Sequence, residues 1–443
     1  MMNSYEQAIQ YLSQFYKRTI NRRNEHHLHI MNELLEHCSI NLDEFQFVQI
    51  AGSCGKGSTT FLLSNMLHEN GIVHGVFTGP HLAKYEERFR MNDGQINEEE
   101  FSQIVLDIAD RLRSYPRFQE IGHMHVMVLI ALFFFTNHHI QLVIFENGVG
   151  GASDPSNVFN PIVAILTEIT LDHCHLLGSS IEEITQDKLH IVKKETQFVV
   201  CGMKNPAART IAEEKEKEAN QPFVFYERDY HSENVRTSVQ SNQFDYKGMD
   251  LILNEISLPL LGEHQVQNTS NALAAIECLS QLGYDFAWEK VRKGIEHTAI
   301  PCRMEMVRHH GISFLFDGAH NSLELETLKK NIQTLNLDIS KIIMTVSSNK
   351  DIRDMMQSIY LEGTEILLVP NPFIERRVSF SEITSQLDTL GHVNYRTFEN
   401  IESSLQYLYQ NAANINGTVL VTGSLYLVGR IKNIINQGDN YFA

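Results

Sequence analysis

The stretch that decides the fold is Gly52-Ser53-Cys54-Gly55-Lys56-Gly57-Ser58, a glycine-rich loop between two segments of different periodicity. The residues before it, FQFVQI at 45–50, are apolar enough to predict a buried strand. Residues 58–70 predict a helix, with Leu62, Leu63, Met66 and Leu67 on one face and Asn70-Gly71 at its end. A strand, a glycine loop and a helix in this order form a cradle for phosphate.

Each residue type in this loop suits the binding of a nucleoside triphosphate. The glycines Gly52, Gly55 and Gly57 allow successive backbone N–H groups to point at phosphate oxygens. Lys56 offers a positive charge to the β- and γ-phosphates, and Ser58 or Thr59 can reach Mg²⁺. The spacing differs from the general GxxxxGK[ST] pattern, so a glycine-rich turn without a ligand is the alternative interpretation.

The bulk properties exclude several classes of protein. A net charge of -18 over 443 residues argues against broad nucleic-acid or anionic-membrane binding. Six cysteines without a CxxC pair indicate a reducing, cytoplasmic compartment. The apolar run at 126–135 is too short to cross a bilayer, so we expect a buried helix there and no membrane partner.

Short apolar runs alternate with helical stretches along the chain, which predicts α/β layers around mainly parallel sheets. In the first part we expect strands at 73–77, 141–145 and 162–169, hairpins at a sheet edge within 200–260, and a helix at 268–282. A second series of strands is expected at 312–316, 342–346, 366–369 and 418–421. The sequence therefore predicts two domains, 1–297 and 298–443.

Short motifs in a fixed order make the chain similar to a known family. The motifs are GSCGKGS at 52–58, FTGPHL at 77–82, ERFR at 87–90, ENGVGG at 146–151, LDH at 171–173, DKLHIVK at 187–193, GEHQVQN at 262–268, PCRME at 301–305, FDGAHN at 316–321 and VTGSLYLVG at 421–429. In the same order they resemble the family's GTNGKGS, FTSPHL, NERIR, EVGLGG, LDH, EKAGIIK, GxHQxxN, PGRFE, LDGAHN and C-terminal motifs. The family is that of folylpolyglutamate synthase and dihydrofolate synthase, within the Mur-ligase superfamily.

This resemblance implies an α/β fold. It would have a P-loop central domain of the Mur-ligase type, with a mainly parallel sheet, and a smaller Rossmann-like C-terminal domain. The implied activity is ATP-dependent amide formation, in which a carboxylate is activated as an acyl phosphate and coupled to an amino acid. Glutamate added to a folate or dihydropteroate is the main expectation. The family also implies two Mg²⁺ ions and a cytoplasmic monomer.

The resemblance assigns the metal site to four residues. Glu146 follows the strand at 141–145 beside a glycine loop, where it could hold Mg²⁺ on the γ-phosphate together with Ser58. His173 would bind a second ion with Lys188, a lysine that is carbamylated in the family. A surface lysine is the alternative for Lys188. The HCH run at 173–175 lacks the separated ligand pairs of a zinc site.

Further residues match the family's nucleotide and substrate contacts. Asn268 and Arg303 would contact the adenine and the phosphates. Asp317 and His320 follow the strand at 312–316, at a strand-end crevice, and would orient the ribose and the incoming amino acid, although they could merely cap a helix. Lys56, Lys188, Asp317 and His320 would be the catalytic set. The implied substrate contacts are Pro80, His81, Arg88, His125, Asp154, His320 and Ser424.

Four positions depart from the family pattern. Cys54 replaces the asparagine of the phosphate loop, Gly79 replaces a metal-side serine, and Ala152 replaces a basic residue. Met124-His125 stands where the family has Phe-Glu. Because loss of a positioned polar group changes discrimination between substrates, a ligase acting on a different carboxylic acid is an alternative. A nucleotide-binding protein without ligase activity is a further alternative.

Overall fold

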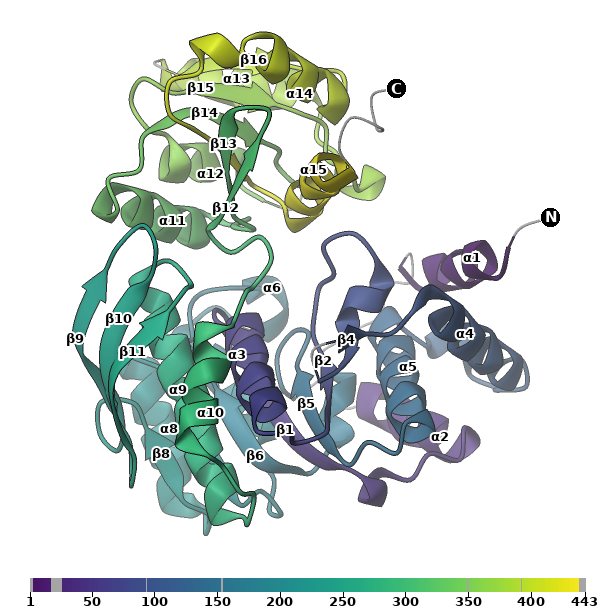
Figure 1. Cartoon of the computed structure of the whole chain (residues 1–443). Helices are drawn as coiled ribbons and strands as arrows, with labels where there is room; N and C mark the ends of the chain where they lie inside the picture. The colour runs from purple at the N-terminus through teal and green to yellow at the C-terminus, as the bar shows by residue number, and fades with distance from the viewer. Residues whose placement is uncertain are drawn as a thin grey trace.

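The computed structural model describes residues 3–16, 26–92, 94–152, 154–348, 350–391 and 393–437. Its larger sheet has eight strands in the order β4-β3-β2-β5-β1-β6-β7-β8 (Figure 1). The strands are β1 (Gln46–Ala51), β2 (His74–Phe77), β3 (Phe89–Met91), β4 (Gly94–Gln95), β5 (Leu142–Glu146), β6 (Pro161–Leu166), β7 (Phe198–Cys201) and β8 (Phe223–Phe225). All pairs from β2 to β8 are parallel, whereas β3 and β4 form an antiparallel edge. The predicted mainly parallel sheet is confirmed.

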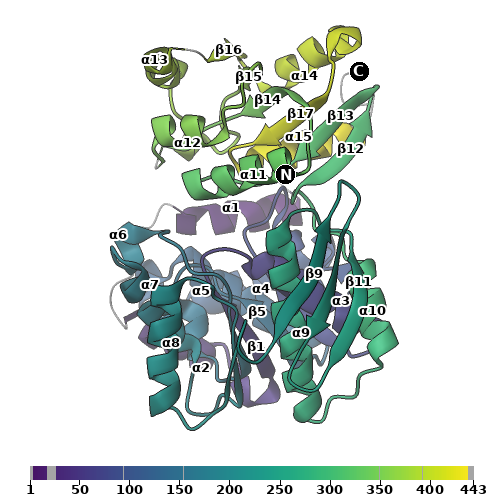
Figure 2. The same cartoon turned by 90° about the vertical axis from the view of Figure 1, so that its left-hand side faces the viewer.

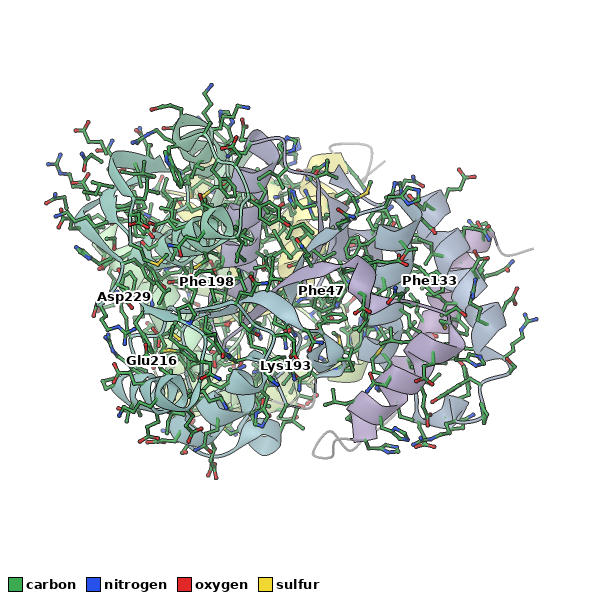
Figure 3. The ribbon with its side chains drawn as sticks, turned by 90° about the horizontal axis from the view of Figure 1, so that it is seen from below. Phe47, Phe133, Lys193, Phe198, Glu216 and Asp229 are labelled. Atoms are coloured by element: carbon green, nitrogen blue, oxygen red, sulfur yellow. The ribbon has the colours of Figure 1, made fainter. Side chains whose placement is uncertain are left out.

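Strand β1 is central because its side chains are buried on both faces of the sheet. Phe47 joins a core with α1 (Ser4–Tyr16), α2 (His26–His37), α4 (Glu98–Leu112) and α5 (His123–Asn137). Val48 and Ile50 join the core with α3 (Lys56–Glu69), α9 (Glu263–Gln281) and α10 (Trp288–Glu296). Figure 3 places Phe47 between Phe133 of α5 and Phe198 of β7. Since alternate side chains point to opposite faces, one strand anchors both helical layers.

The segment between β6 and β8 completes the sheet on one side. It contains α6 (Cys174–Leu177), α7 (Ile181–Lys188) and α8 (Pro206–Glu218). Ile184 and Ala208 of the last two helices pack with Ala164 and Val199 of β6 and β7. The sequence did not predict β7 or β8, which are short and carry only three or four residues each.

The hairpins predicted at a sheet edge within 200–260 exist, and they form a sheet of their own. β9 (His231–Thr237), β10 (Asn242–Lys247) and β11 (Ile252–Leu258) form a separate antiparallel sheet. Its apolar side, which includes Phe244, Tyr246 and Ile256, shares the core of α9. That covering explains why the alternation has one apolar and one polar side. The helix predicted at 268–282 begins earlier, at Glu263.

The second sheet has the order β12-β13-β17-β14-β15-β16. Its strands are β12 (Glu305–His309), β13 (Ile312–Phe316), β14 (Ile339–Met344), β15 (Glu365–Leu368), β16 (Asn394–Thr397) and β17 (Thr418–Thr422). Apart from the antiparallel β12, neighbouring strands are parallel. One face is covered by α11 (Ser322–Thr334), α12 (Ile352–Ile359) and α13 (Phe380–Leu390), and the other by α14 (Ile401–Gln410) and α15 (Leu425–Gln437).

A linker joins the two α/β units. Helix α10 ends at Glu296 and β12 begins at Glu305. Figures 1 and 2 both place the second sheet over the end of the first unit where α3 begins, with α11 on the side nearest to it. We propose a domain boundary at 297/298, where this linker starts. No helix in the described ranges combines the length and apolarity needed to span a membrane.

Candidate active site

The phosphate loop lies where β1 ends, between the parallel neighbours β5 and β6. Helix α3 begins at Lys56, two residues before the predicted start, so the loop is tight. A Cβ atom on Gly52 would lie 1.8 Å from Thr167 Oγ1. A Cβ atom on Gly55 would lie 2.2 Å from Asn268 Oδ1, and Gly55 also has a φ of 87°. Both glycines are therefore required by space, and Asn268 lies directly against the loop.

The Gly55→Ala substitution tests this packing. A left-handed backbone and the clash with Asn268 are expected to lower the free energy of unfolding by about 2 kcal/mol and to weaken ATP binding. Thermal unfolding and ATP titration measure the two effects. Gly71→Ala is the matched control, because Gly71 also has a positive φ of 76° but has no atom within 4 Å of its Cβ position. Equal losses in both variants would assign the effect to backbone strain alone.

Two lysines meet at one carbonyl oxygen of the loop. Lys56 Nζ donates to Gly52 O at 2.9 Å and to Ser53 O at 3.3 Å. Lys188 Nζ, from the end of α7, donates to the same Gly52 O at 2.8 Å. Burial, and then the neighbouring Lys56 charge, lower the pKa of Lys188 to about 7. Lys188 is 4% exposed, so the surface-lysine alternative is wrong.

Glu146 lies opposite these lysines, at the end of β5. Its Oε2 accepts a hydrogen bond from the Thr78 hydroxyl and one of 3.1 Å from Gly79 N–H. A Cβ atom on Gly57 would lie 3.6 Å from Oε2, an ordinary van der Waals distance, so the carboxylate lies directly beside the loop. Burial raises the pKa of Glu146, and Lys56 acts against that rise. Within the described residues Oε1 accepts no hydrogen bond, which leaves a hard oxygen donor suited to Mg²⁺.

The other predicted metal ligands lie near this centre. Ser58 and Thr59 are buried in the first turn of α3, and the Thr59 hydroxyl has no hydrogen-bond partner in the described ranges. His173 has a left-handed backbone with a φ of 51°, and its Nε2 lies 3.6 Å from Asp172 Oδ2. Burial lowers the pKa of His173 to about 4. The described residues contain no cluster of three His, Cys, Asp or Glu side chains that could hold a metal ion alone.

Residues of the linker and second domain face the phosphate loop. The carboxylate of Asp317 follows β13 and accepts from Met304 N–H at 3.0 Å and Ala319 N–H at 2.9 Å. Burial raises the pKa of Asp317, and the Arg303 guanidinium acts against that rise. His320 lies on the loop before α11, and Ser424 is buried just before α15.

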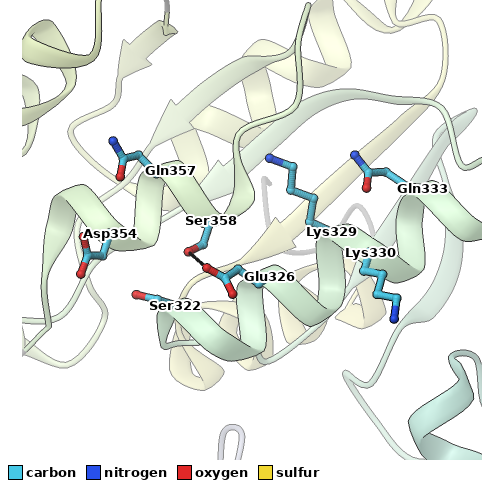
Figure 4. Close-up of a pocket in the computed structure, with 8 residues that line it drawn as sticks. All are labelled: Ser322, Glu326, Lys329, Lys330, Gln333, Asp354, Gln357 and Ser358. Carbon is cyan, nitrogen blue, oxygen red and sulfur yellow. Dashed lines mark hydrogen bonds between the residues drawn. The ribbon is translucent and has the colours of Figure 1, made fainter. Parts of the chain in front are cut away.

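A cavity of about 260 Å³ connects the two units. Its lining includes Gly57, Thr78, Glu146, Arg303, Lys432 and Asn433, so it reaches from the phosphate loop past the linker to α15. A second hollow of about 380 Å³ lies between α11 and α12 (Figure 4). No residue of the phosphate loop or the linker lines this second hollow. The first cavity is therefore the one associated with the candidate chemistry.

The FTGPHL segment lies against a buried cation, Arg88 of the neighbouring ERFR motif. Pro80 is exposed and lines the cavity, whereas Arg88 is 6% exposed. Arg88 Nε donates to His81 Nδ1 at 2.9 Å, and in the described part of the chain its terminal nitrogens donate no hydrogen bond. Burial, and then the Arg88 charge, lower the pKa of His81 to about 2. The guanidinium is therefore able to receive a carboxylate.

Two predicted substrate contacts, His125 and Asp154, are buried and hydrogen-bonded within the protein. His125 is buried in the first turn of α5, where Nδ1 accepts from Gly122 N–H at 2.9 Å and Nε2 bonds the His27 carbonyl at 3.1 Å. Asp154 is 2% exposed, and its carboxylate accepts hydrogen bonds from Gly148, Val149 and Ser156. The hydrogen bonds of both side chains therefore stabilise the local backbone. Asp154 thereby fixes the loop after Glu146.

Three residues of the site escaped the sequence prediction. Thr78 precedes Gly79 in FTGPHL and contacts Glu146. Lys350 follows β14. Burial lowers the pKa of His173, Asp172 acts against that change, and the charge of Lys350 adds to the lowering. Glu324, one turn into α11, pairs with His320. Lys350 could have been found from its position after a predicted strand, whereas Glu324 resembles an ordinary helix-start glutamate.

Comparisons with known proteins agree with this architecture. The family model of the Mur ligase middle domain matches residues 120–278, and that of the dihydrofolate synthetase C-terminal domain matches residues 301–434. The chain is 27% identical over 389 residues to dihydrofolate synthase/folylpolyglutamate synthase of Bacillus subtilis, covering 86% of this chain and 89% of the relative. It is 27% identical over 416 residues to a probable dihydrofolate synthetase of Schizosaccharomyces pombe, covering 90% and 95%.

Solved structures share the fold over nearly the whole chain. Mycobacterium tuberculosis folylpolyglutamate synthase complexed with ADP has a TM-score of 0.86 at 22% identity, covering 98% of both chains. Escherichia coli FolC in complex with DHPP and ADP has a TM-score of 0.82 at 22% identity, covering 99% of both. The two units and their phosphate loop thus form a Mur-type ligase architecture. Over nearly its full length the chain is therefore similar to proteins named folylpolyglutamate synthase or dihydrofolate synthase.

Proposed function

We propose that this protein is an ATP-dependent ligase that activates a carboxylate as an acyl phosphate and couples it to an amino acid. Glutamate added to a folate or dihydropteroate is the main candidate, because the relatives over nearly the full length have these names. We further propose that it acts as a cytoplasmic monomer, in keeping with free cysteines throughout the described residues.

The observation that carries this proposal is the arrangement of charge around Gly52 and Gly57. Lys56 and Lys188 share one carbonyl on one side of the loop, and the Glu146 carboxylate lies beside Gly57. Cations that neutralise phosphate charge and a carboxylate that holds a divalent ion are what phosphoryl transfer requires. The cavity that begins here extends to Arg303 and the second domain. Two reactants can therefore meet at the loop.

The reaction would proceed in two balanced steps. A carboxylate oxygen of the acid attacks the γ-phosphorus of ATP, and ADP leaves with the electrons of the broken P–O bond. The ammonium group of the amino acid gives one proton to a base, and the amine attacks the acyl carbon. Phosphate leaves with the electrons of the broken C–O bond and takes up the second proton. Lys56 neutralises charge on the transferring group, and Arg303 adds a second cation when the domains close around the substrates.

Two finer features belong to this proposal. Glu146, Ser58 and His173 would hold Mg²⁺, which neutralises charge on the phosphates when bound. Lys188 would bear a carbamate that serves as a further oxygen ligand for a second ion. The buried amine of Lys188 donates to Gly52 O, and the carboxylates of Asp187, Asp172 and Asp154 act on its pKa. These surroundings support a lysine side chain that can change its charge state.

The direct test supplies ATP, Mg²⁺ and glutamate with either dihydropteroate or tetrahydrofolate, and looks for the glutamyl adduct by mass spectrometry. We expect one added glutamate with at least one of the two acids. Turnover with an unrelated acid and none with these would reject the folate assignment and keep the ligase assignment. ATP binding without acid-dependent turnover across a broad panel of acids would favour the non-catalytic alternative.

One observation favours a different carboxylic acid as second candidate. A Cβ atom on Gly79 would lie 2.9 Å from Arg88 Nη1, so the absence of the family's serine lets the guanidinium occupy that space. The position of the Arg88 guanidinium against Gly79 bears on where an acid can be held. Discrimination between acids depends on such positioned charges.

Gly79→Ser is expected to displace Arg88 and to raise KM for this protein's preferred acid about 10-fold, because the acid loses its positioned cation. KM for ATP should stay within about 2-fold, since the phosphate loop is untouched. Steady-state kinetics with each substrate varied in turn measure both constants. An unchanged KM for every acid would show that this position does not select the acid.

A further inference from the structure

His320 is held by two acceptors on the same side of its ring. Nδ1 lies 3.0 Å from Gly318 O and 3.0 Å from Glu324 Oε2. A carbonyl and a carboxylate both accept hydrogen bonds, so Nδ1 must carry the proton. Nε2 is therefore the nitrogen with the lone pair in the neutral ring. Within the described residues Nε2 has no protein partner, and the side chain keeps 37% of its surface exposed.

Glu324 is bound more tightly to His320 than helix capping requires. It is the third residue of α11, whose N-cap Asn321 accepts from Glu324 N–H at 2.9 Å. A glutamate at this place usually bonds back to the N–H of the N-cap residue. Here Glu324 Oε2 instead accepts from His320 N–H at 2.9 Å, one residue before the cap. One carboxylate oxygen thus holds both the backbone and the ring of His320.

Charged groups from other elements surround this pair. Burial acts to raise the pKa of Glu324, but the attraction of His320 lowers it to about 2. The charge of Arg303, from the linker, adds to this lowering. Lys350 after β14 opposes the protonation of His320, whereas Glu324 favours it and raises its pKa against burial. Across the domain gap, burial and then the Glu324 charge raise the pKa of the Cys54 thiol to about 11. The pair therefore lies within electrostatic reach of the phosphate loop.

We propose that Glu324 is a positioning residue that fixes His320 as a proton acceptor for the incoming amine. This inference rests on the proposed ligase function. The ammonium group gives one proton to Nε2, and the freed lone pair forms the C–N bond. Phosphate leaves with the electrons of the broken C–O bond and takes up the second proton. Glu324 stabilises the imidazolium that forms and keeps Nε2 on the open side of the ring.

The Glu324→Gln variant separates this role from helix capping, because glutamine keeps the size and a carbonyl acceptor for His320 N–H but removes the charge. We expect kcat to fall about 10-fold with little change in KM for ATP. Since neutral His320 is the active form and its pKa should fall without the carboxylate, the acid limb of the kcat profile should move to lower pH. Glu326→Gln is the matched control on the same helix, where Glu326 accepts from Ser358 (Figure 4).

NMR of ¹⁵N-histidine-labelled full-length protein tests the pairing without any turnover, with His320→Gln used to assign the resonance. We expect the Nδ1–H tautomer in the neutral ring and a lower His320 pKa in Glu324→Gln than in the wild type and Glu326→Gln. An Nε2–H tautomer in the wild type, or the same His320 titration in all three proteins, would overturn the proposal. A failure of the ligase assay with these NMR results intact would instead count against the proposed function.

Discussion

Replacing Lys56 by alanine is expected to lower kcat at least about 10³-fold. Lys56 is the lysine of the phosphate loop itself, and its Nζ is held by Gly52 O and Ser53 O in a position from which it can turn toward a phosphate. Removing one preorganised group that stabilises developing charge costs two to three orders of magnitude in rate. Because the lost interaction strengthens as the phosphoryl group moves, kcat should suffer more than KM for ATP. Steady-state kinetics measure both.

Lys290→Ala is the control, since Lys290 is an exposed lysine at the start of α10 in the same unit. It should leave both constants within about 2-fold of the wild type. Melting temperatures of the two variants exclude unfolding as the cause. Near-normal turnover by Lys56→Ala would mean that the loop at 52–58 does not bind the transferred phosphate.

Replacing Glu146 by glutamine is expected to lower kcat about 10³-fold and leave the melting temperature the same or higher. Glutamine retains an acceptor for the Thr78 hydroxyl and Gly79 N–H but loses the charge that would hold Mg²⁺. Since burial raises the pKa of Glu146, the charged form is unfavourable in the folded protein, and its removal should not destabilise. Kinetics over a series of Mg²⁺ concentrations test the expected loss of kcat, and thermal unfolding tests the expected melting temperature.

The contrast between activity and stability makes this test specific. A purely structural Glu146 would lose stability and activity together. Glu263→Gln, at the exposed start of α9, provides the matched charge loss. The ratio of the activity of Glu146→Gln to that of the wild type is measured at limiting and at saturating Mg²⁺. If this ratio is the same at both concentrations, the assignment of Glu146 to the metal is wrong.

The central part of the fold could be predicted because it depends on local pattern. Strands such as β1 and β13 are apolar on both faces, and a glycine loop or polar cluster marks where each ends. What escaped depended on tertiary contacts. The sheet of β9 to β11 alternates like an edge hairpin, and only its packing on α9 shows that it stands apart.

The candidate site followed the same division. Lys56, Glu146 and Asp317 could be proposed from the sequence because each lies at, or shortly after, the carboxyl end of a strand, where parallel sheets gather their ligands. For His125 and Asp154, the sequence could not show that backbone N–H groups of the protein donate to their side chains. Glu324 was missed because a glutamate near the start of a helix has the pattern of an ordinary capping residue. Only the structure shows that its side chain pairs with His320.

Transfer of a carboxylate oxygen of the acid to phosphate is the most direct test of acyl phosphate formation. The acid substrate found in the adduct assay is labelled with ¹⁸O in both carboxylate oxygens and converted with ATP, Mg²⁺ and amino acid. Activation as an acyl phosphate predicts one ¹⁸O in the inorganic phosphate for each amide formed, with ADP as the other product. Phosphate free of label, or label in AMP, would contradict the proposed chemistry.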